Sequence, residues 1–533
     1  MSSSIAHSSI VGAFAGTRIG LAGVIVLALT MAACSSPPIH AQQSSQTAEH
    51  ATPLSQRDIE WLRRISFGLD SAEVARYQEL GRARFLGTQL SSNGRDVLPP
   101  SINQLIHSYE AINTPAQQLL AQLQDERKRI KSLPDGEEKA AAKKATQKHG
   151  NELLSQARQA ELLRAVYGSD QLQEQLVWFW LNHFSVYAAK GSGRWTAADY
   201  EENVIRPHAL GKFKDLVMAT LQSPSMLEFL DNAKNAKGKV NENYAREVME
   251  LHTLGVGSGY TQQDVQQLAL ILTGVGLAPR SDRSHRIAPR WKPLLVQHGM
   301  FEFNPARHDF GDKVFLGQSI KGRGFAEVQQ AVEMITRQPA CARFVARQLA
   351  EYFVADNPSP ALVAAMAKTF QRTDGDIAAV MRTLLESKEL TASYGKKFKD
   401  PMQFVVSAMR LAYDGKPIAN AAPLVNWLNQ LGEPLYGRIT PDGWPLDASG
   451  WNSSGQMAKR FEVARSIGSG TNQLFRAEGS PKTRAGFPLL TTRLYYEAVE
   501  PYLSAQTRGA LKKATSQQEW NTFLLSSPDF NYR

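Results

Sequence analysis

Residues 241–265 have the sequence NENYAREVMELHTLGVGSGYTQQDV, which is typical of a helix that borders a protein core. On a helix that turns about 100° per residue, the apolar side chains form one stripe and the polar ones an adjacent arc. The stripe consists of Tyr244, Val248 and Leu251. The arc consists of Asn243, Arg246, Glu247 and Glu250. A polar arc of this kind beside a core is either an ion-pair lock or a functional site.

The arc supports two interpretations. In the first, Glu247 and Glu250 are catalytic carboxylates, one of them with a raised pKa, and Arg246 assists them. In the second, Arg246 and Glu250 form an ion pair one helical turn apart, within a hydrogen-bonded structural lock. Both alternatives require the same spacing, so both stay open.

A divalent metal at the two glutamates would need a histidine as a further ligand. His252 lies roughly 140° or more around the helix from both glutamates, at about 100° per residue. The candidate metal ligands are therefore His183, from an apolar helix, and His308, from a later turn. The chain has neither a His-Glu-x-x-His motif nor repeated Glu-x-x-His pairs. The cofactor stays unknown, with a divalent metal as one option.

Other polar residues along the chain are candidates for ligand binding. An arginine could hold an anionic group, and the amides and carboxylates could orient it. These candidate binding residues are Arg206, Asn182, Asn243, Asp231 and Asp309. The chain lacks the Gly-x-Ser-x-Gly, Walker and dinucleotide-binding motifs.

The N-terminal residues predict export. Residues 19–33 form a short apolar run that suits a signal peptide (residues 1–33). The run ends in Met31-Ala32-Ala33-Cys34, which resembles a bacterial lipobox with Cys34 as the lipidated residue. Residues 34–54, rich in Ser and Gln, would form a polar tether. Serines after Cys34 resemble the outer-membrane sorting pattern, with the body facing the periplasm. The alternative is cleavage after Ala41 and a soluble secreted or periplasmic protein.

Composition fits a globular protein. Of the 533 residues, 43% are hydrophobic and 21% are charged, and the formal net charge is +10. The basic residues are not arranged in a nucleic-acid-binding motif, so no nucleic-acid partner is expected. Of the two cysteines, Cys341 lies in an apolar helical pattern and is expected to be a buried, inert thiol.

The chain is expected to be mostly α: a multi-helical body with a projecting charged helical hairpin and one small β-hairpin. Residues 55–470 would form the helical domain, and residues 471–533 a helical or irregular C-terminal extension. The helical hairpin is expected at residues 115–165, because two charged, alanine-rich helices flank Pro134-Asp135-Gly136. Residues 300–304 and 313–316 predict two short strands around a turn.

The 241–265 stretch, continued to residue 274, is similar to the identifying motif of the bacterial domain-of-unknown-function family 1800. Agreement in order covers about residues 55–470. The chain departs from the family pattern at Val275, where a tryptophan is common, and at residues 280–299, which resemble an insertion. Supporting segments include WLRRISFG (61–68), WFWLNHFSV (178–186), ARHDFGDKVFLG (306–317) and KDPMQFVVSAMR (399–410).

The resemblance implies an exported or envelope protein of mostly helical build, without an established activity. It also implies a partner, since such proteins are often encoded beside a second uncharacterised exported family, number 1501. We favour a scaffold or binding lipoprotein that is attached to the membrane by its lipid and acts with that partner. The alternative is a periplasm-facing hydrolase or metal-assisted enzyme that uses the Glu/His/Arg cluster.

Overall fold

The computed structural model describes residues 54–91, 97–278, 287–470, 473–479 and 486–533. The predicted signal peptide, Cys34 and all but the last residue of the tether lie outside these ranges. Residues Thr52–Arg533 make up a single compact unit. Among the described residues, no helix combines the length and apolarity needed to cross a membrane.

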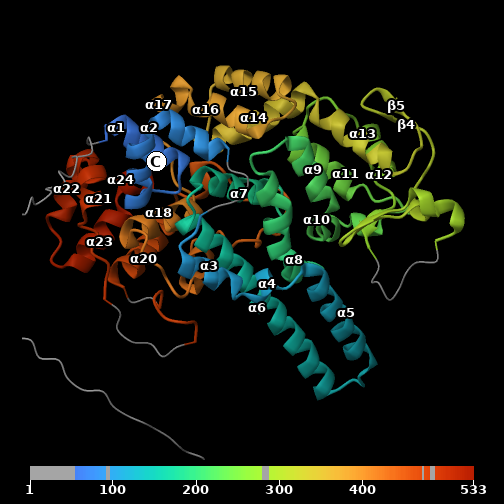
Figure 1. Ribbon diagram of the computed structural model, residues 1–533, viewed down its shortest axis with the longest axis horizontal. Helices are drawn as coiled ribbons and strands as arrows, with labels where there is room; N and C mark the ends of the chain where they lie inside the picture. The colour runs from blue at the N-terminus through green and yellow to red at the C-terminus, as the bar shows by residue number, and fades with distance from the viewer. Residues whose placement is uncertain (1–53, 92–96, 279–286, 471–472, 480–485) are drawn as a thin grey trace, which may run out of the picture. The chain divides into compact units, whose positions relative to one another are not determined.

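Helices dominate this unit, which confirms the mostly α prediction (Figure 1). The helices of the first half are α1 (Gln56–Ile65), α2 (Ser71–Leu90), α3 (Pro100–His107), α4 (Glu110–Asn113), α5 (Ala116–Ser132), α6 (Glu137–Tyr167), α7 (Gln171–His183), α8 (Gly193–Asp199), α9 (Phe213–Gln222), α10 (Pro224–Phe229), α11 (Asn243–Glu247) and α12 (Gln262–Ile271). Those of the second half are α13 (Phe325–Thr336), α14 (Pro339–Phe353), α15 (Pro360–Arg372), α16 (Ile377–Leu385), α17 (Lys388–Ala392), α18 (Pro401–Tyr413), α19 (Ala422–Gln430), α20 (Ser454–Ser469), α21 (Arg493–Ala498), α22 (Ala505–Leu511), α23 (Gln517–Ser526) and α24 (Pro528–Asn531).

Among the described residues, η1 (Tyr200–Ile205) and η4 (Val248–Thr253) are wound as π-helices, and each continues directly from an α-helix. Such turns are rare and occur preferentially at functional or strained positions. Short 3-10 helices are η2 (Arg206–His208), η3 (Asn232–Lys234), η6 (Pro289–Leu294), η7 (Pro305–Arg307), η8 (Ala448–Gly450) and η9 (Glu500–Tyr502).

In the part of the chain that the structure describes, the β structure consists of two small antiparallel sheets. One has the strand order β1-β3-β2, and the other pairs β4 with β5. The strands are β1 (Val275–Leu277), β2 (Val296–His298), β3 (Phe301–Phe303), β4 (Lys313–Phe315) and β5 (Gln318–Ile320).

Both predicted strands exist, as β3 and β4, but their expected pairing is wrong, because they belong to different sheets. Leu316 and Gly317 both have positive φ, 47° and 75°, and form the tight turn that pairs β4 with β5. The segment between β3 and β4 is instead occupied by η7 and by the buried His308.

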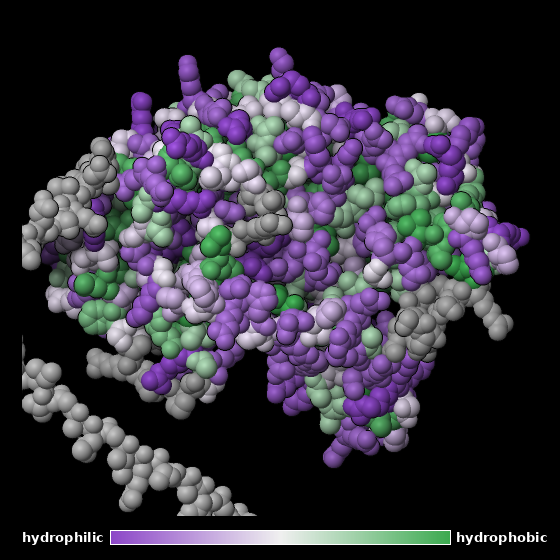
Figure 2. All heavy atoms as spheres, viewed as in Figure 1, coloured by the Kyte–Doolittle hydropathy of each residue, from purple (hydrophilic) through white to green (hydrophobic). Residues whose placement is uncertain are grey.

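The predicted helical hairpin is present as α5 and α6, which extend away from the body at the lower right of Figure 1. Its surface is largely hydrophilic in Figure 2. A small separate core at its base contains Leu119, Leu123, Leu153 and Trp195. Gly150 lies against Trp195: a Cβ atom at this glycine would be 2.3 Å from the indole ring. The hairpin is therefore attached through its base.

Residues after 470, expected as an extension, belong to the main core. Leu494, Leu524 and Phe530 are buried in the same cluster as Trp61 of α1. Helix α23 packs extensively on α20. Cys341 is buried in α14 and free, and burial raises the pKa of its thiol, as expected for an inert cysteine.

Candidate functional site

The 241–265 stretch forms α11, the π-helix η4 and the start of α12. The wider turn of η4 is held by Thr253, whose hydroxyl donates to the carbonyl of Val248 at 2.6 Å. Gly255, with φ of 83°, ends this helix beside the ring of Phe344. The capping box of α12 is present, since Thr261 and Asp264 exchange hydrogen bonds. The stretch therefore folds as two helices joined by a glycine-rich turn.

Arg246 lies in a surface ion-pair network that joins α11 to α12. Its guanidinium lies 3.1 Å from Glu242 and 3.6 Å from Glu250, and it donates to Gln262 at 2.9 Å. Gln262 in turn donates to Glu242 at 2.7 Å. This is the geometry of the structural alternative, in which Arg246 and Glu250 pair one turn apart.

Glu247 is the member of the arc outside this network, because its carboxyl group makes no hydrogen bond or ion pair within the described residues. Burial raises the pKa of its carboxyl, and the nearby charges of Glu250 and Asp442 add to that rise. Burial also raises the pKa of Tyr260 to about 12, and its hydrogen bond to Glu250 contributes. Glu247 is thus a half-buried acid that binds its proton more tightly than a free glutamate.

The candidate histidine ligand of this arc lies in the core. The Nε2–H of His183 donates to the carbonyl of His252 at 2.9 Å, and the two rings are 6.1 Å apart. Burial lowers the pKa of His183 to about 4 and that of His252 to about 3. Within the described residues, no three His, Cys, Asp or Glu side chains are grouped to hold a metal ion. The structure therefore does not bring Glu247, Glu250 and a histidine together as a ligand set.

His308 forms a separate buried network. Its Nδ1 lies 2.8 Å from the carbonyl of Thr273, and its Nε2 lies 3.0 Å from the carboxylate of Glu327. Lys313 donates to the other oxygen of Glu327 at 2.6 Å. The neighbouring Asp309 accepts a hydrogen bond from the Gly311 amide at 2.9 Å and so fixes the turn before β4. These contacts use both nitrogens of His308 and connect the loop to the segment after α12 and to α13.

Arg206 is surrounded by carboxylates in the interior. It donates to Glu201 at 2.7 Å and to Glu174, and lies 3.3 Å from Glu161. All three glutamates are at most 2% exposed. Burial raises the pKa of Glu161 well above its usual range, and the adjacent Glu201 raises it further, which favours a proton between the two acids. Arg206 therefore neutralises buried acids of α6, α7 and η1.

A pocket of about 430 Å³ lies elsewhere, between α1, α18 and the C-terminal helices. None of its lining residues belongs to the 241–265 stretch. Its apolar walls include Leu411, Val499 and Phe530, and its polar walls include Arg63 and Lys399. The pocket brings together three segments that are far apart in the sequence, near residues 56–69, 394–411 and 498–532.

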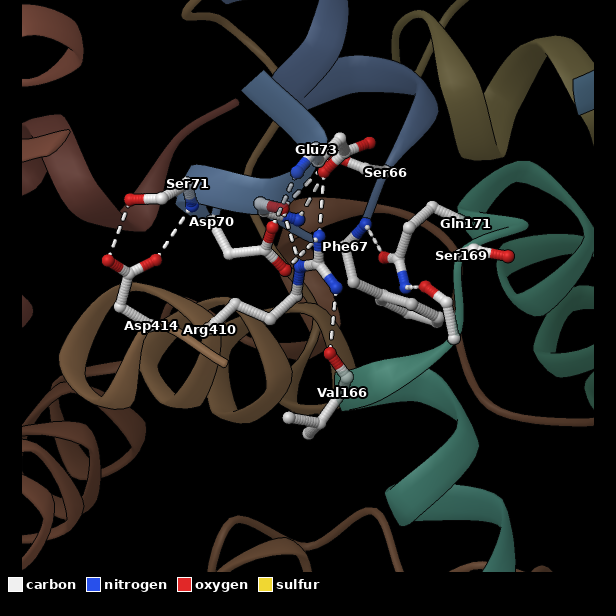
Figure 3. A network of polar contacts seen from close by, with 12 residues as sticks. Ser66, Phe67, Asp70, Ser71, Glu73, Val166, Ser169, Gln171, Arg410 and Asp414 are labelled. Carbon is white, nitrogen blue, oxygen red and sulfur yellow. Dashed lines mark hydrogen bonds and ion pairs between the residues drawn. The ribbon is translucent and has the colours of Figure 1, made fainter. Parts of the chain in front are cut away.

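The wall beside α18 is fixed by a buried arginine (Figure 3). Arg410 donates to the carbonyl of Gly68 at 2.6 Å, to that of Val166 at 2.7 Å and to Glu73 at 2.7 Å. Burial raises the pKa of Glu73 to about 7, and the negative charge of Asp70 adds to this rise. The network attaches the loop after α1 to α6 and α18, which keeps this part of the pocket in place.

A family model described as a protein of unknown function, DUF1800, matches residues 60–532. The chain belongs to the DUF1800 family. The match extends past residue 470, to the helices that close the pocket. No curated protein and no solved structure matches the chain.

The asparagines that contribute to the DUF1800 resemblance form hydrogen bonds with backbone groups of neighbouring segments. Asn182 donates to the carbonyl of Trp444 at 2.9 Å and accepts from its amide at 2.6 Å. Asn243 donates to the carbonyl of Leu230 at 3.1 Å and so attaches α11 to the end of α10. Asp231, in a left-handed conformation with φ of 61°, forms an ion pair with Lys190 at 2.8 Å. In this DUF1800 protein these candidate binding residues make structural contacts.

Sequence reasoning missed the pocket residues of this DUF1800 protein. Lys399 and Ser407 lie in KDPMQFVVSAMR, a segment that supported the resemblance without being singled out for chemistry. The only local signal was a lysine just before a helix whose face is apolar. The other wall comes from residues more than 300 positions earlier, so no local motif spans the site.

Proposed function

We propose that this DUF1800 protein is a lipid-anchored binding protein of the bacterial envelope, and that the pocket between α1, α18 and α24 is its binding site. The pocket is the observation that carries the proposal. Its volume of about 430 Å³ lies in the range of small-molecule sites. Its lining combines apolar side chains from α18, α21 and α24 with hydroxyl, amine, guanidinium and carboxylate groups. This lining suits a ligand with an apolar body and a carbonyl or carboxyl group.

Calorimetric titration of the purified chain with decanoate and with decanol tests this binding. Val499→Trp places an indole in the pocket and is expected to abolish binding, whereas Val256→Trp, at a position that is 79% exposed, leaves it unchanged. Absence of binding for both probes, or equal binding by the two variants, would count against the pocket as the ligand site.

The anchor and its sorting rest on the sequence around Cys34. The proposal is that the mature chain starts at a lipidated Cys34, and that the 34–54 tether holds the body on the periplasmic side of the outer membrane. Metabolic labelling with a fatty acid and membrane fractionation of Cys34→Ala test this. We expect the variant to lose the label and appear in the soluble fraction. A soluble, unlabelled wild-type chain would instead favour cleavage after Ala41.

The partner is proposed to be an exported protein of uncharacterised family 1501. The hairpin of α5 and α6 supports a surface role, because its small core lies at its base and its surface is largely hydrophilic. Crosslinking in membranes, followed by mass spectrometry, should recover the partner with the wild-type chain. A shortened chain without residues 125–147 should recover less of it. Recovery of the wild-type chain alone would contradict the proposal.

The alternative function is a hydrolase that uses the Glu/His/Arg cluster. One observation favours it: Glu247 is half-buried, free of ion pairs within the described residues, and has a raised pKa, as a general acid requires. The Glu247→Gln variant tests it, because it removes the proton donor and keeps the shape. Unchanged turnover of any substrate found for the wild-type chain would exclude this role.

A further inference from the structure

Lys399 differs from the other deeply buried lysines of the described residues. Lys313, Lys397 and Lys399 are 1%, 2% and 4% exposed. Lys313 forms an ion pair with a glutamate and Lys397 with an aspartate. The amine of Lys399 instead lies 2.9 Å from the hydroxyl oxygen of Ser407. A buried amine without a carboxylate partner is expected to be neutral, and a neutral amine can accept a proton.

The surroundings of Lys399 also disfavour its charged form. Burial lowers the pKa of its amine well below the usual range, and three arginines add to the effect. One contact acts in the other direction, because the Nζ lies 3.8 Å from the centre of the Phe530 ring, where a cation–π interaction favours the ammonium form. The charged groups that act on it are Arg63 and Glu60 of α1, Arg460 of α20, and Arg533. Of these, only Glu60 favours the ammonium form.

Ser407 is held rigidly opposite this amine. It lies in α18, where its hydroxyl also lies 3.1 Å from the carbonyl of Phe404. Gly68 packs directly on it: a Cβ atom at this glycine would be 2.7 Å from the Cβ of Ser407. The carbonyl of Gly68 is in turn fixed by Arg410. Ser407 and Lys399 both line the pocket of about 430 Å³.

We propose that Ser407 is a nucleophile and Lys399 its general base, and that together they hydrolyse carboxylic esters with an apolar acyl chain. The proposal rests on the pocket being the ligand site. A hydroxyl within hydrogen-bond distance of a neutral amine is the arrangement by which Ser-Lys enzymes activate serine. It uses no residue of the 241–265 stretch.

The reaction would proceed in two steps. In the first, Ser407 Oγ forms a bond to the ester carbonyl carbon while its proton passes to Lys399 Nζ. The bond from that carbon to the alcohol oxygen then breaks, and the Lys399 ammonium returns the proton to the departing alkoxide. In the second, water attacks the acyl-serine and gives a proton to Lys399, which passes it to Ser407 Oγ as the carboxylic acid leaves.

A decyl fluorophosphonate probe tests the nucleophile. It forms an Oγ–P bond with loss of fluoride, and we expect mass spectrometry of the labelled chain to locate it on Ser407. Ser407→Ala should lose the label. Ser526→Ala is the matched control, because Ser526 also bonds a carbonyl of its own helix and lies outside the pocket. Labelling of another residue, or none in the wild-type chain, would overturn the proposal.

The base is tested with Lys399→Met, which keeps the stem and removes the amine. We expect labelling of this variant to fall at least tenfold. Labelling of the wild-type chain should be highest where the Lys399 amine is neutral and should fall as the pH is lowered and the amine binds a proton. The pH profile of the wild-type chain still tests the base if the variant does not fold. A flat profile, or equal labelling of a folded Lys399→Met chain, would reject the base. Decanoate binding separates the two proposals: binding without labelling overturns only the catalysis, and absence of both overturns the pocket as well.

Discussion

At the scale of single residues, the two arginines that the sequence predicted to be functional lie in opposite environments. Arg206 is 6% exposed and faces three buried carboxylates, whereas Arg246 lies in a half-exposed network. Replacing Arg206 with Met should destabilise the fold by about 3–5 kcal/mol, because it leaves buried acids without their cation. Arg246→Ala should cost at most about 1 kcal/mol, since it removes only surface ion pairs. Urea unfolding measures both, and equal losses would contradict this distinction.

The buried histidine pair makes a pH-dependent contribution. The pKa values of His183 and His252 fall from 6.5 to about 4 and about 3 in the folded chain. Above pH 6.5 both histidines are neutral in the folded and unfolded states, so they do not affect stability. As the pH falls from 6.5 towards 4, the unfolded chain binds protons that the folded chain excludes, so stability decreases. Each unit of pKa difference corresponds to about 1.4 kcal/mol.

Urea unfolding between pH 7 and pH 4 checks this contribution. The chain that carries His183→Phe and His252→Leu should lose less stability over this range than the wild-type chain. The control variant His107→Gln, at an exposed position, should follow the wild-type curve. Parallel curves for all three chains would refute the role of the pair.

At the scale of elements, two glycines within helices distinguish the effect of tight packing from the effect of backbone freedom in the unfolded chain. Gly150 of α6 touches Trp195, whereas Gly87 of α2 has open space where a Cβ atom would lie. Gly87→Ala should stabilise the chain by about 0.4–1 kcal/mol, because alanine restricts the unfolded state. Gly150→Ala should destabilise it by about 1–3 kcal/mol, because the indole must move. Thermal unfolding of the two variants decides this, and a gain in stability for Gly150→Ala would contradict the packing of the hairpin base.

Elements were predictable where one segment determines its own structure. The hairpin of α5 and α6 and the capping box of α12 follow from local helix periodicity and from the Thr261 and Asp264 pair. The partners of β3 and β4 could not be predicted in this way, because each strand pairs with a segment outside the predicted turn. The environment of Arg206 could not be predicted from the sequence either, since its three acids come from α6, α7 and η1. The pocket needed the whole fold to bring its walls together.

At the scale of the whole molecule, buried arginines join distant segments through backbone and amide oxygens. Arg64 of α1 donates to the carbonyls of Phe353 and Ser393 and to that of Arg533 at 2.7 Å. Arg533 itself donates to Gln175 of α7 and to the carbonyl of Tyr352 in α14, each at 2.7 Å. One interior thus contains the first helix, the central helices and the last residue.

Arg533→Met should therefore reduce the stability of the entire unit, although the residue lies beyond the end of α24. Each buried group that loses its partner costs about 1–3 kcal/mol, and the variant removes the donors to Gln175 and Tyr352. Arg493→Met removes an arginine whose side chain is 79% exposed and should change stability by at most about 0.5 kcal/mol. Trp61 in α1 and Trp180 in α7 report on the central core, so their fluorescence during urea unfolding measures the effect. A midpoint for Arg533→Met that matches that of Arg493→Met would show that the last residue does not hold these helices together.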